Sequence, residues 1–301
     1  MNDAGKRPVE GVEAAELRRS LPCRKCRYDL RGLAIGGVCP ECGLAVVDSV
    51  RAAIDPMAGR LPRLTNPRSV GNALLWLIMC LDAAAIVLTG RALGLRLDAL
   101  GRPHLVDMMP RGVVLGAVLV AVAALPAVVL LAPPREAEGI GVVRRNLWRL
   151  GGGLLALAAG AATAWALASE LAAFAEIEES LLLITLALGI AATMLPLRGI
   201  LQTIGERSRQ YRTARSERQR AIDMVAAAVG MIAGETVRLA VRGGDLGILA
   251  TLGGTIAWIS ALMALIGFGY LTVNAVWIRR ALRRPPPTLH ELVTRANTDE
   301  G

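Results

Sequence analysis

Four cysteines near the N-terminus have the residue type and the spacing of a metal site. Cys23 and Cys26 form one Cys-x-x-Cys pair, and Cys39 and Cys42 form a second pair after a gap of twelve residues. In zinc ribbons, two such knuckles hold one tetrahedral ion with four thiolates. Because protein ligands then fill every coordination position, the predicted site is structural and offers no place for a reactive water. Gly43, directly after the second knuckle, can adopt the positive φ of a tight turn.

Zn²⁺ is the expected ion, and iron and disulfide bonds are the alternatives. A rubredoxin-like iron site uses the same Cys-Pro-x-Cys-Gly sequence, but Tyr28 is the only aromatic residue near the knuckles. Disulfide bonds would require an oxidising compartment. A ribbon of roughly 25 residues has too little core to fold alone, so the ion would provide most of its folding free energy, about 10–16 kcal/mol in zinc-finger peptides.

The two knuckles also resemble a known signature, in the segments Cys23-Arg-Lys-Cys26-Arg-Tyr-Asp-Leu-Arg-Gly32 and Cys39-Pro-Glu-Cys42-Gly43. This signature is similar to that of planctomycete-type bacterial proteins in which a short zinc ribbon precedes a membrane domain. The resemblance covers only this part of the chain. It implies a structural metal and a cytoplasmic ribbon, and it assigns no activity. The first knuckle departs from the usual Pro-x pattern, since Arg and Lys stand between its cysteines, but the ligands are unaffected.

The remainder of the chain is a series of long apolar segments. The 301 residues are 54% hydrophobic but only 3% aromatic, a composition that suits helices packed in lipid. About 20 apolar residues are needed for a helix to cross the hydrocarbon. We therefore predict an all-α membrane protein of about six transmembrane helices behind a small zinc ribbon, with spans at Ser69–Gly90, Gly112–Ala132, Leu147–Ala168, Leu181–Leu201, Ala221–Val241 and Leu246–Ile278.

Five regions follow from these segments: a polar N-terminal segment (1–21), the zinc ribbon (22–47), a basic linker (48–68), a helical transmembrane domain (69–278) and a tail (279–301). Positively charged loops mark the cytoplasmic side of a membrane protein. Arginines crowd the linker, the loops 135–149 and 198–220 and the tail, whereas the loop between the third and fourth spans carries only acidic charges. If Ala221–Val241 is counted as a span, these basic segments and both termini are cytoplasmic. The arginines of loop 91–111 are the exception.

The N-terminus shows no secretory signal, so we expect the ribbon to stay in the cytoplasm and the helices to lie in the inner membrane. Three of the charged residues inside the predicted spans are candidates for function. Asp82 lies near the middle of the first span, where a carboxylate should face the bundle and find a partner. Glu235 and Arg238 are close enough in sequence to pair, and Arg238 is also a candidate partner for Asp82. These residues could line a proton or cation path, or they could form a structural clamp.

Small residues recur at every fourth position of the third span, at Gly152, Ala156, Gly160, Ala164 and Ala168. Small side chains let helix backbones come close, so we expect this ladder to pack within the bundle. Homodimerisation through the same ladder is the alternative.

The functional hypotheses come from three classes. The chain contains no Gly-x-Ser-x-Gly, no P-loop and no His-Glu-x-x-His, so we expect a non-enzymatic protein whose ribbon docks a cytoplasmic protein partner or stabilises an assembly. The alternative is a small transporter or channel that uses Asp82, Glu235 and Arg238. A tether to nucleic acid comes third. The net charge of +9 and the basic ribbon residues suit phosphate contacts, but lipid headgroups and the anionic metal centre account for the same charges.

Overall fold

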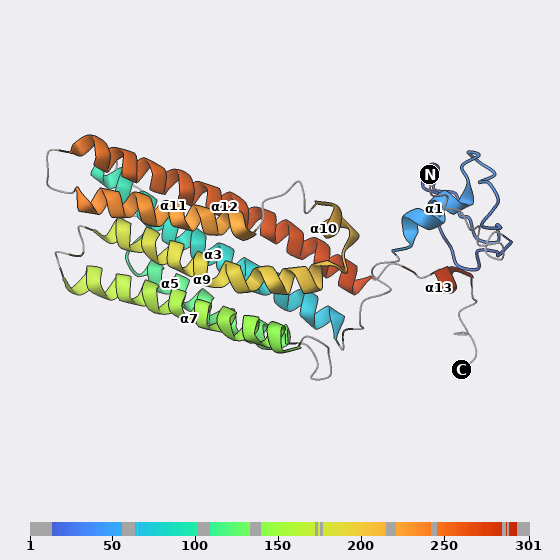
Figure 1. The fold of residues 1–301 in the computed structure, drawn as a ribbon, viewed down its shortest axis with the longest axis horizontal. Helices are drawn as coiled ribbons and strands as arrows, with labels where there is room; N and C mark the ends of the chain where they lie inside the picture. Colours follow the sequence, from blue (N-terminus) through green and yellow to red (C-terminus); the bar gives the residue numbers. More distant parts are fainter. Residues whose placement is uncertain are drawn as a thin grey trace, which may run out of the picture. The chain divides into compact units, whose positions relative to one another are not determined.

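The computed structural model describes residues 14–55, 64, 66–101, 109–132, 140–171, 174, 177–214, 221–241, 246–284, 287 and 289–293. The chain forms two compact units, residues 1–61 with 284–301, and residues 62–283. Within the described ranges every regular element is a helix, which confirms the all-α prediction (Figure 1). Parts of the predicted N-terminal segment, linker, loops and tail lie outside these ranges.

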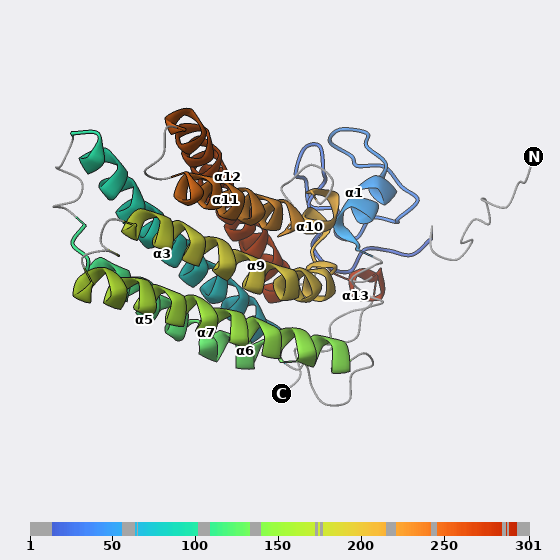
Figure 2. The ribbon, with the colours of Figure 1, turned by 60° about the vertical axis from the view of Figure 1, so that its left-hand side comes forward.

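The larger unit is a bundle of long helices. Its elements are α3 (Pro67–Ala99), α5 (Val113–Ala123), α6 (Leu125–Leu130), α7 (Ile140–Glu170), α9 (Glu178–Gly205), α10 (Arg209–Ala214), α11 (Ala221–Ala240) and α12 (Gly247–Arg283). Helices α3 and α9 are the most buried and lie in the middle, with α5, α6 and α7 on one side and α11 and α12 on the other (Figure 2). Their core consists mainly of leucine and alanine side chains.

Five helical segments are long and apolar enough to cross a membrane: 67–99, 113–130, 141–170, 178–205 and 247–283. These correspond to five of the six predicted spans. The sixth, Ala221–Val241, forms α11, which packs against α9 and α12 but carries Asp223, Glu235 and Arg238. The predicted count of six crossings is therefore not established by apolar length alone.

Two prolines act differently on their helices. Pro126 lies where the second span breaks at Ala124 into α5 and α6. The indole Nε1 of Trp76 donates a 2.9 Å hydrogen bond to the carbonyl oxygen of Ala123 beside this break. Pro196, by contrast, lies inside the continuous helix α9. Because a proline has no N–H, the carbonyl of Ala192 one turn earlier loses its usual donor.

Glycines allow two of the closest helix contacts. A Cβ on Gly153 of α7 would lie 2.8 Å from the oxygen of that Ala192 carbonyl, so only glycine fits there without a shift of the backbone. In the same way, a Cβ on Gly234 of α11 would lie 2.4 Å from the carbonyl oxygen of Gly253 on α12. Backbones therefore meet directly between α7 and α9 and between α11 and α12.

The small-residue ladder predicted on α7 is only partly at the helix interface. Gly160 contacts Thr185 of α9, and Ala164 and Ala168 are buried. Gly152 and Ala156, however, are exposed, and the buried glycine is Gly153. The physical reason is the helical period. A step of four residues turns about 40° beyond a full turn, so four such steps rotate the ladder by about 160°.

The smaller unit has a core of its own. It contains α1 (Val46–Ala53) and α13 (Leu289–Val293) and three isolated backbone bridges, with no β-strand among its described residues. The segment before Pro22 belongs to this fold. Leu17 and Leu21 are buried, and the Leu17 N–H donates to the carbonyl oxygen of Leu33 at 2.9 Å. Leu292 of α13, from the opposite end of the chain, completes this core.

Candidate metal centre and the polar clusters of the bundle

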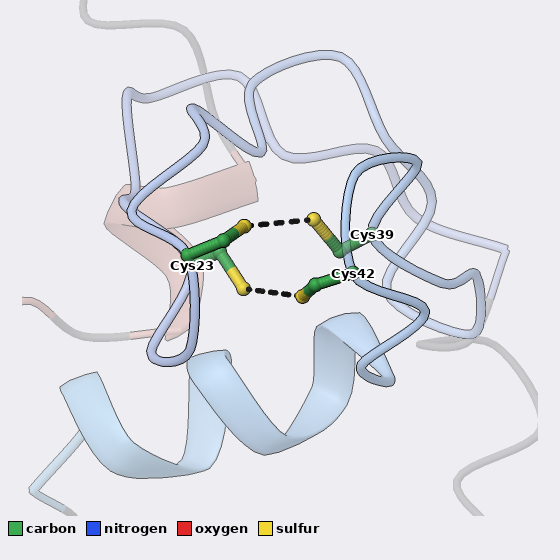
Figure 3. A group of neighbouring side chains, drawn as sticks. Cys23, Cys39 and Cys42 are labelled. Carbon is green, nitrogen blue, oxygen red and sulfur yellow. Dashed lines mark hydrogen bonds between the residues drawn. The ribbon is translucent and has the colours of Figure 1, made fainter.

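The four predicted metal ligands come together. The Sγ atoms of Cys23, Cys26, Cys39 and Cys42 all lie within 4.8 Å of one another, and this cluster could hold a metal ion. Its two shortest contacts, Cys23 to Cys42 and Cys26 to Cys39, are 3.6 Å long and each joins one knuckle to the other (Figure 3). A tetrahedral ion with bonds of about 2.3 Å to sulfur needs sulfur–sulfur distances of about 3.8 Å.

These sulfur–sulfur distances distinguish a metal site from disulfide bonds. A disulfide requires the sulfurs to lie about 2.05 Å apart, and all four cysteines here are free. The donor set therefore fits a tetrahedral ion bound by thiolates. Zinc and iron share this geometry, so the geometry leaves the identity of the ion open.

The backbone gives the two knuckles the same shape. In the first, the N–H of Arg27 donates to the carbonyl of Cys23 at 2.9 Å, and in the second the N–H of Gly43 donates to the carbonyl of Cys39 at 2.9 Å. The residue after the second cysteine has a positive φ in both, 66° for Arg27 and 70° for Gly43. The positive φ predicted at Gly43 is confirmed. Arg27 adopts the same conformation without the freedom of glycine, at an energetic cost of about 1–2 kcal/mol.

Electrostatics also point to a cation at this cluster. The backbone N–H groups of Cys26 and Lys25 point at the sulfur of Cys23 and lower the pKa of its thiol to about 6. The N–H of Tyr28 acts in the same direction on Cys26, but burial and the hydrogen bonds with the other thiols raise the pKa of Cys26 to about 12. Four thiolates so close together repel one another, so a bound cation is needed to keep all of them deprotonated.

Helix α1 and the chain on either side of the first knuckle hold its cysteines in place. Ser49 of α1 is buried, and its Oγ accepts a 3.2 Å hydrogen bond from the N–H of Arg24 between the first two cysteines. Asp29 accepts 3.1 Å hydrogen bonds from the N–H groups of Arg31 and Leu21. The bond from Arg31 is the main reason why the pKa of Asp29 is lowered. The first knuckle is thus tied to chain outside its Cys-x-x-Cys motif.

The C-terminal helix also closes the ribbon. The carbonyl oxygen of Leu292 accepts hydrogen bonds from the N–H of Arg18 at 2.9 Å and of Arg19 at 3.3 Å. The side chain of Leu292 is 1% exposed. Sequence reasoning assigned residues 279–301 to a tail and gave Leu292 no role. The sequence signal for α13 is weak, because this helix is only five residues long.

In the bundle, an ion-pair cluster gathers around the first turn of α9. Glu178 is 2% exposed and accepts from Arg91 at 2.9 and 3.3 Å and from Arg111 at 3.0 Å. Arg91 also donates to the carbonyl of Met109 at 2.7 Å. The helix N-terminus itself favours these negative charges. Two of the arginines in segment 91–111, the exception to the charge pattern, therefore share one buried carboxylate, which offsets part of their charge.

A second ion-pair cluster lies beside the first, around Glu179. The carboxylate of Glu179 accepts from Arg238 of α11 at 2.8 Å and from the indole of Trp258 at 3.0 Å. Arg238 also donates to Ser180 at 2.6 Å and pairs with Glu235 at 2.8 Å. The predicted pair between Glu235 and Arg238 is confirmed. Sequence reasoning missed Glu178 and Glu179, although an acidic pair directly ahead of an apolar segment and opposite an arginine-rich loop was a usable signal.

Asp82 lies elsewhere in the bundle, and the suggested contact with Arg238 is wrong. Its Oδ2 accepts from the hydroxyl of Thr272 on α12, whereas Arg238 packs near Gly254 at the other end of that helix. Gly234, one turn before Arg238 on α11, lies against Ala257 of α12. Ala257 and Thr272, which bonds Asp82, are fifteen residues apart on α12, so Arg238 and Asp82 lie about 22 Å apart along that helix. Asp82 and Glu235 therefore do not form one site.

Comparison with known protein families, curated proteins and solved structures finds no match for this chain. The geometry of the four-sulfur cluster and of the bundle is accordingly the basis for assigning a function.

Proposed function

We propose that this chain is a non-enzymatic protein of the bacterial inner membrane whose ribbon, folded around one Zn²⁺, docks a cytoplasmic protein partner. The observation that carries the proposal is the four-sulfur cluster, which lies in a compact unit with its own core, separate from the bundle. With thiolates in all four positions, the ion would stabilise the fold and would not activate water. A module of this kind acts through its surface.

The surface around the first knuckle is basic. Arg24, Lys25, Arg27 and Arg31 are all exposed, beside the half-exposed ring of Tyr28. Part of this charge offsets the formal charge of about −2 on a zinc ion with four thiolates. The remainder favours an acidic partner surface, because complementary charge speeds encounter and fixes register.

We count α11 as a sixth crossing beside the five apolar segments. Its charges are paired, Glu235 with Arg238 at 2.8 Å, and this pairing lowers the cost of crossing. With six crossings both ends of the bundle lie on the cytoplasmic side, which the basic linker and the basic tail favour.

The first experiment is the metal content of the detergent-purified full chain, beside the variant Cys23→Ser, Cys26→Ser. We expect about one zinc per chain in the native protein and loss of zinc in the variant. Iron with visible colour would move the proposal to electron transfer. Absence of both metals from protein purified without chelator would refute it.

A second candidate function is a small transporter or channel. It is favoured by two buried carboxylate oxygens, Asp82 Oδ1 and Glu235 Oε1, which reach no hydrogen-bond partner among the described residues. Flux in proteoliposomes separates the two functions. For a transporter, Asp82→Asn should abolish flux and ribbon changes should matter little. For a docking module, Arg24→Glu with Lys25→Glu should abolish crosslinking to the partner, while Asp82→Asn and the matched charge change Arg51→Glu on α1 should leave it intact.

A further inference from the structure

A groove opens on the side of the bundle where α3, α6 and α12 meet. Its volume is about 460 Å³, and its walls are mainly apolar. Trp76, Met79 and Leu130 line it, and each of these side chains is about half exposed. The groove lies beside the break between α5 and α6, where Pro126 contributes to its wall. If these helices span a membrane, as proposed above, an apolar recess of this kind faces lipid tails.

One end of the groove is positively charged. Arg279, which lines it, donates from Nε to Oδ1 of Asn72 at 2.8 Å, and Arg283 donates from Nη2 to the same oxygen at 3.0 Å. A neutral amide oxygen thus holds two guanidinium groups side by side. In the described part of the chain, no carboxylate lies within ion-pair distance of either group. Guanidinium groups have five N–H donors each, and their fork suits the oxygens of a phosphate.

The close contact of α3 and α12 fixes the position of this charge. A Cβ on Gly71 would lie 3.1 Å from the Cα of Arg279, so the two backbones meet directly beside the arginine. Asn72 belongs to the second turn of α3, and Arg279 lies in the last turns of α12, which ends at Arg283. The charge is therefore at the end of both spans, at the level of the headgroups.

The apolar walls extend from that level into the hydrocarbon. Met79 lies seven residues further along α3 than Asn72, about 10 Å deeper. A ligand that fits needs an anionic head at the surface and a hydrocarbon chain below it. We propose that this groove binds an anionic phospholipid, with its phosphate on Arg279 and Arg283 and one acyl chain along Trp76, Met79 and Leu130. The inference rests on the proposed insertion of the bundle in a membrane.

The test uses the full chain in nanodiscs that contain phosphatidylglycerol and phosphatidylcholine with identical acyl chains, followed by mass spectrometry of the intact protein with retained lipid. The native protein should retain phosphatidylglycerol in preference to phosphatidylcholine. The double variant Arg279→Gln, Arg283→Gln should lose this preference for phosphatidylglycerol by a factor on the order of ten. The matched double variant Arg144→Gln, Arg145→Gln should keep the preference of the native protein. The control pair is exposed near the start of α7 and does not line the groove.

A second variant tests the apolar part without changing charge. Met79→Trp fills the groove and should reduce retention of both lipids, with phosphatidylglycerol falling to the level of bulk lipid. Equal preference in the two arginine double variants, or a native protein without preference, would overturn the proposal and indicate annular lipid only. Extraction of the chain from membranes by alkaline carbonate would instead refute membrane insertion, so failure of the two proposals can be told apart.

Discussion

Removing the negative charge of Glu178 should destabilise the bundle more than any exposed charge change. Glu178→Gln keeps the shape of the side chain but replaces one carboxylate oxygen with an NH2 group, which cannot accept a hydrogen bond. The side chains of Arg91 and Glu178 are only 4% and 3% exposed, and their closest atoms lie 2.9 Å apart. In the variant, the charge of Arg91 would keep only neutral oxygen partners, the carbonyl of Met109 and the remaining amide oxygen, and no negative charge would lie beside it.

The size of the effect follows from the burial of both partners. Breaking a buried ion pair by removing one member costs about 3–5 kcal/mol, because the other charge remains buried and uncompensated. For a domain of this size, each kcal/mol of lost unfolding free energy lowers the melting temperature by about 2–4 °C. The variant should therefore melt about 6–20 °C lower than the native protein. Arg111 is 42% exposed, and Arg111→Gln should cost only about 0–1 kcal/mol.

The assay is thermal unfolding of the full chain in a mild detergent. The matched control is Glu170→Gln at the exposed end of α7, which should change the unfolding free energy by no more than about 0.5 kcal/mol. The double variant Arg91→Met, Glu178→Gln should be less destabilised than the sum of its single variants, because the orphaned charge is gone. Melting of Glu178→Gln within the error of Glu170→Gln would refute the argument that this pair is buried.

Two further predictions concern packing. Gly234→Ala would place a Cβ against the backbone of α12 and should lower the free energy of unfolding by about 1–3 kcal/mol. The control Gly269→Ala, whose Cβ meets no atom within 4 Å, should raise it by about 0.5–1 kcal/mol. Equal shifts in melting temperature for the two variants would contradict the close crossing of α11 and α12. Leu292→Ala should destabilise the ribbon by about 2–5 kcal/mol and speed the loss of zinc to a chelator. The control Val38→Ala, at a side chain that is 60% exposed, should leave zinc retention unchanged. An unchanged rate of zinc release from Leu292→Ala would show that the ribbon does not need α13 to hold its metal.

The local features of the ribbon could be predicted from the sequence because they depend on short spacings. Two Cys-x-x-Cys pairs bring their sulfurs together through turns that each knuckle forms by itself, and Gly43 marks one of these turns. Leu292 could not be predicted, because its burial depends on a contact with residues more than 250 positions earlier. Leu17 and Leu21, four residues apart, have the spacing of a helix, yet they lie on irregular, non-helical chain in the ribbon core.

In the bundle, apolar length predicted the existence of helices better than their ends. The first span was expected to end at Gly90, but α3 continues to Ala99, because Arg91 finds a buried partner within the bundle. An unpaired arginine at that depth would have favoured a loop. The pairing of Glu235 with Arg238 followed from their spacing along one helix, whereas the contacts to Glu179 and Ser180 depend on how α9 packs against α11.

The burial of Leu292 in the ribbon also sets the order in which the protein can mature. The cysteines leave the ribosome first, but the residue that completes their core is made roughly 240 residues after α1, about 12–48 seconds later at ordinary rates of synthesis. Until then the N-terminal unit lacks one wall of its core. A chain truncated before α13 would therefore carry an incompletely packed ribbon even when every cysteine and every membrane helix is present, and such a chain would be open to proteolysis. The ribbon in this way reports whether synthesis has passed the last helix of the bundle.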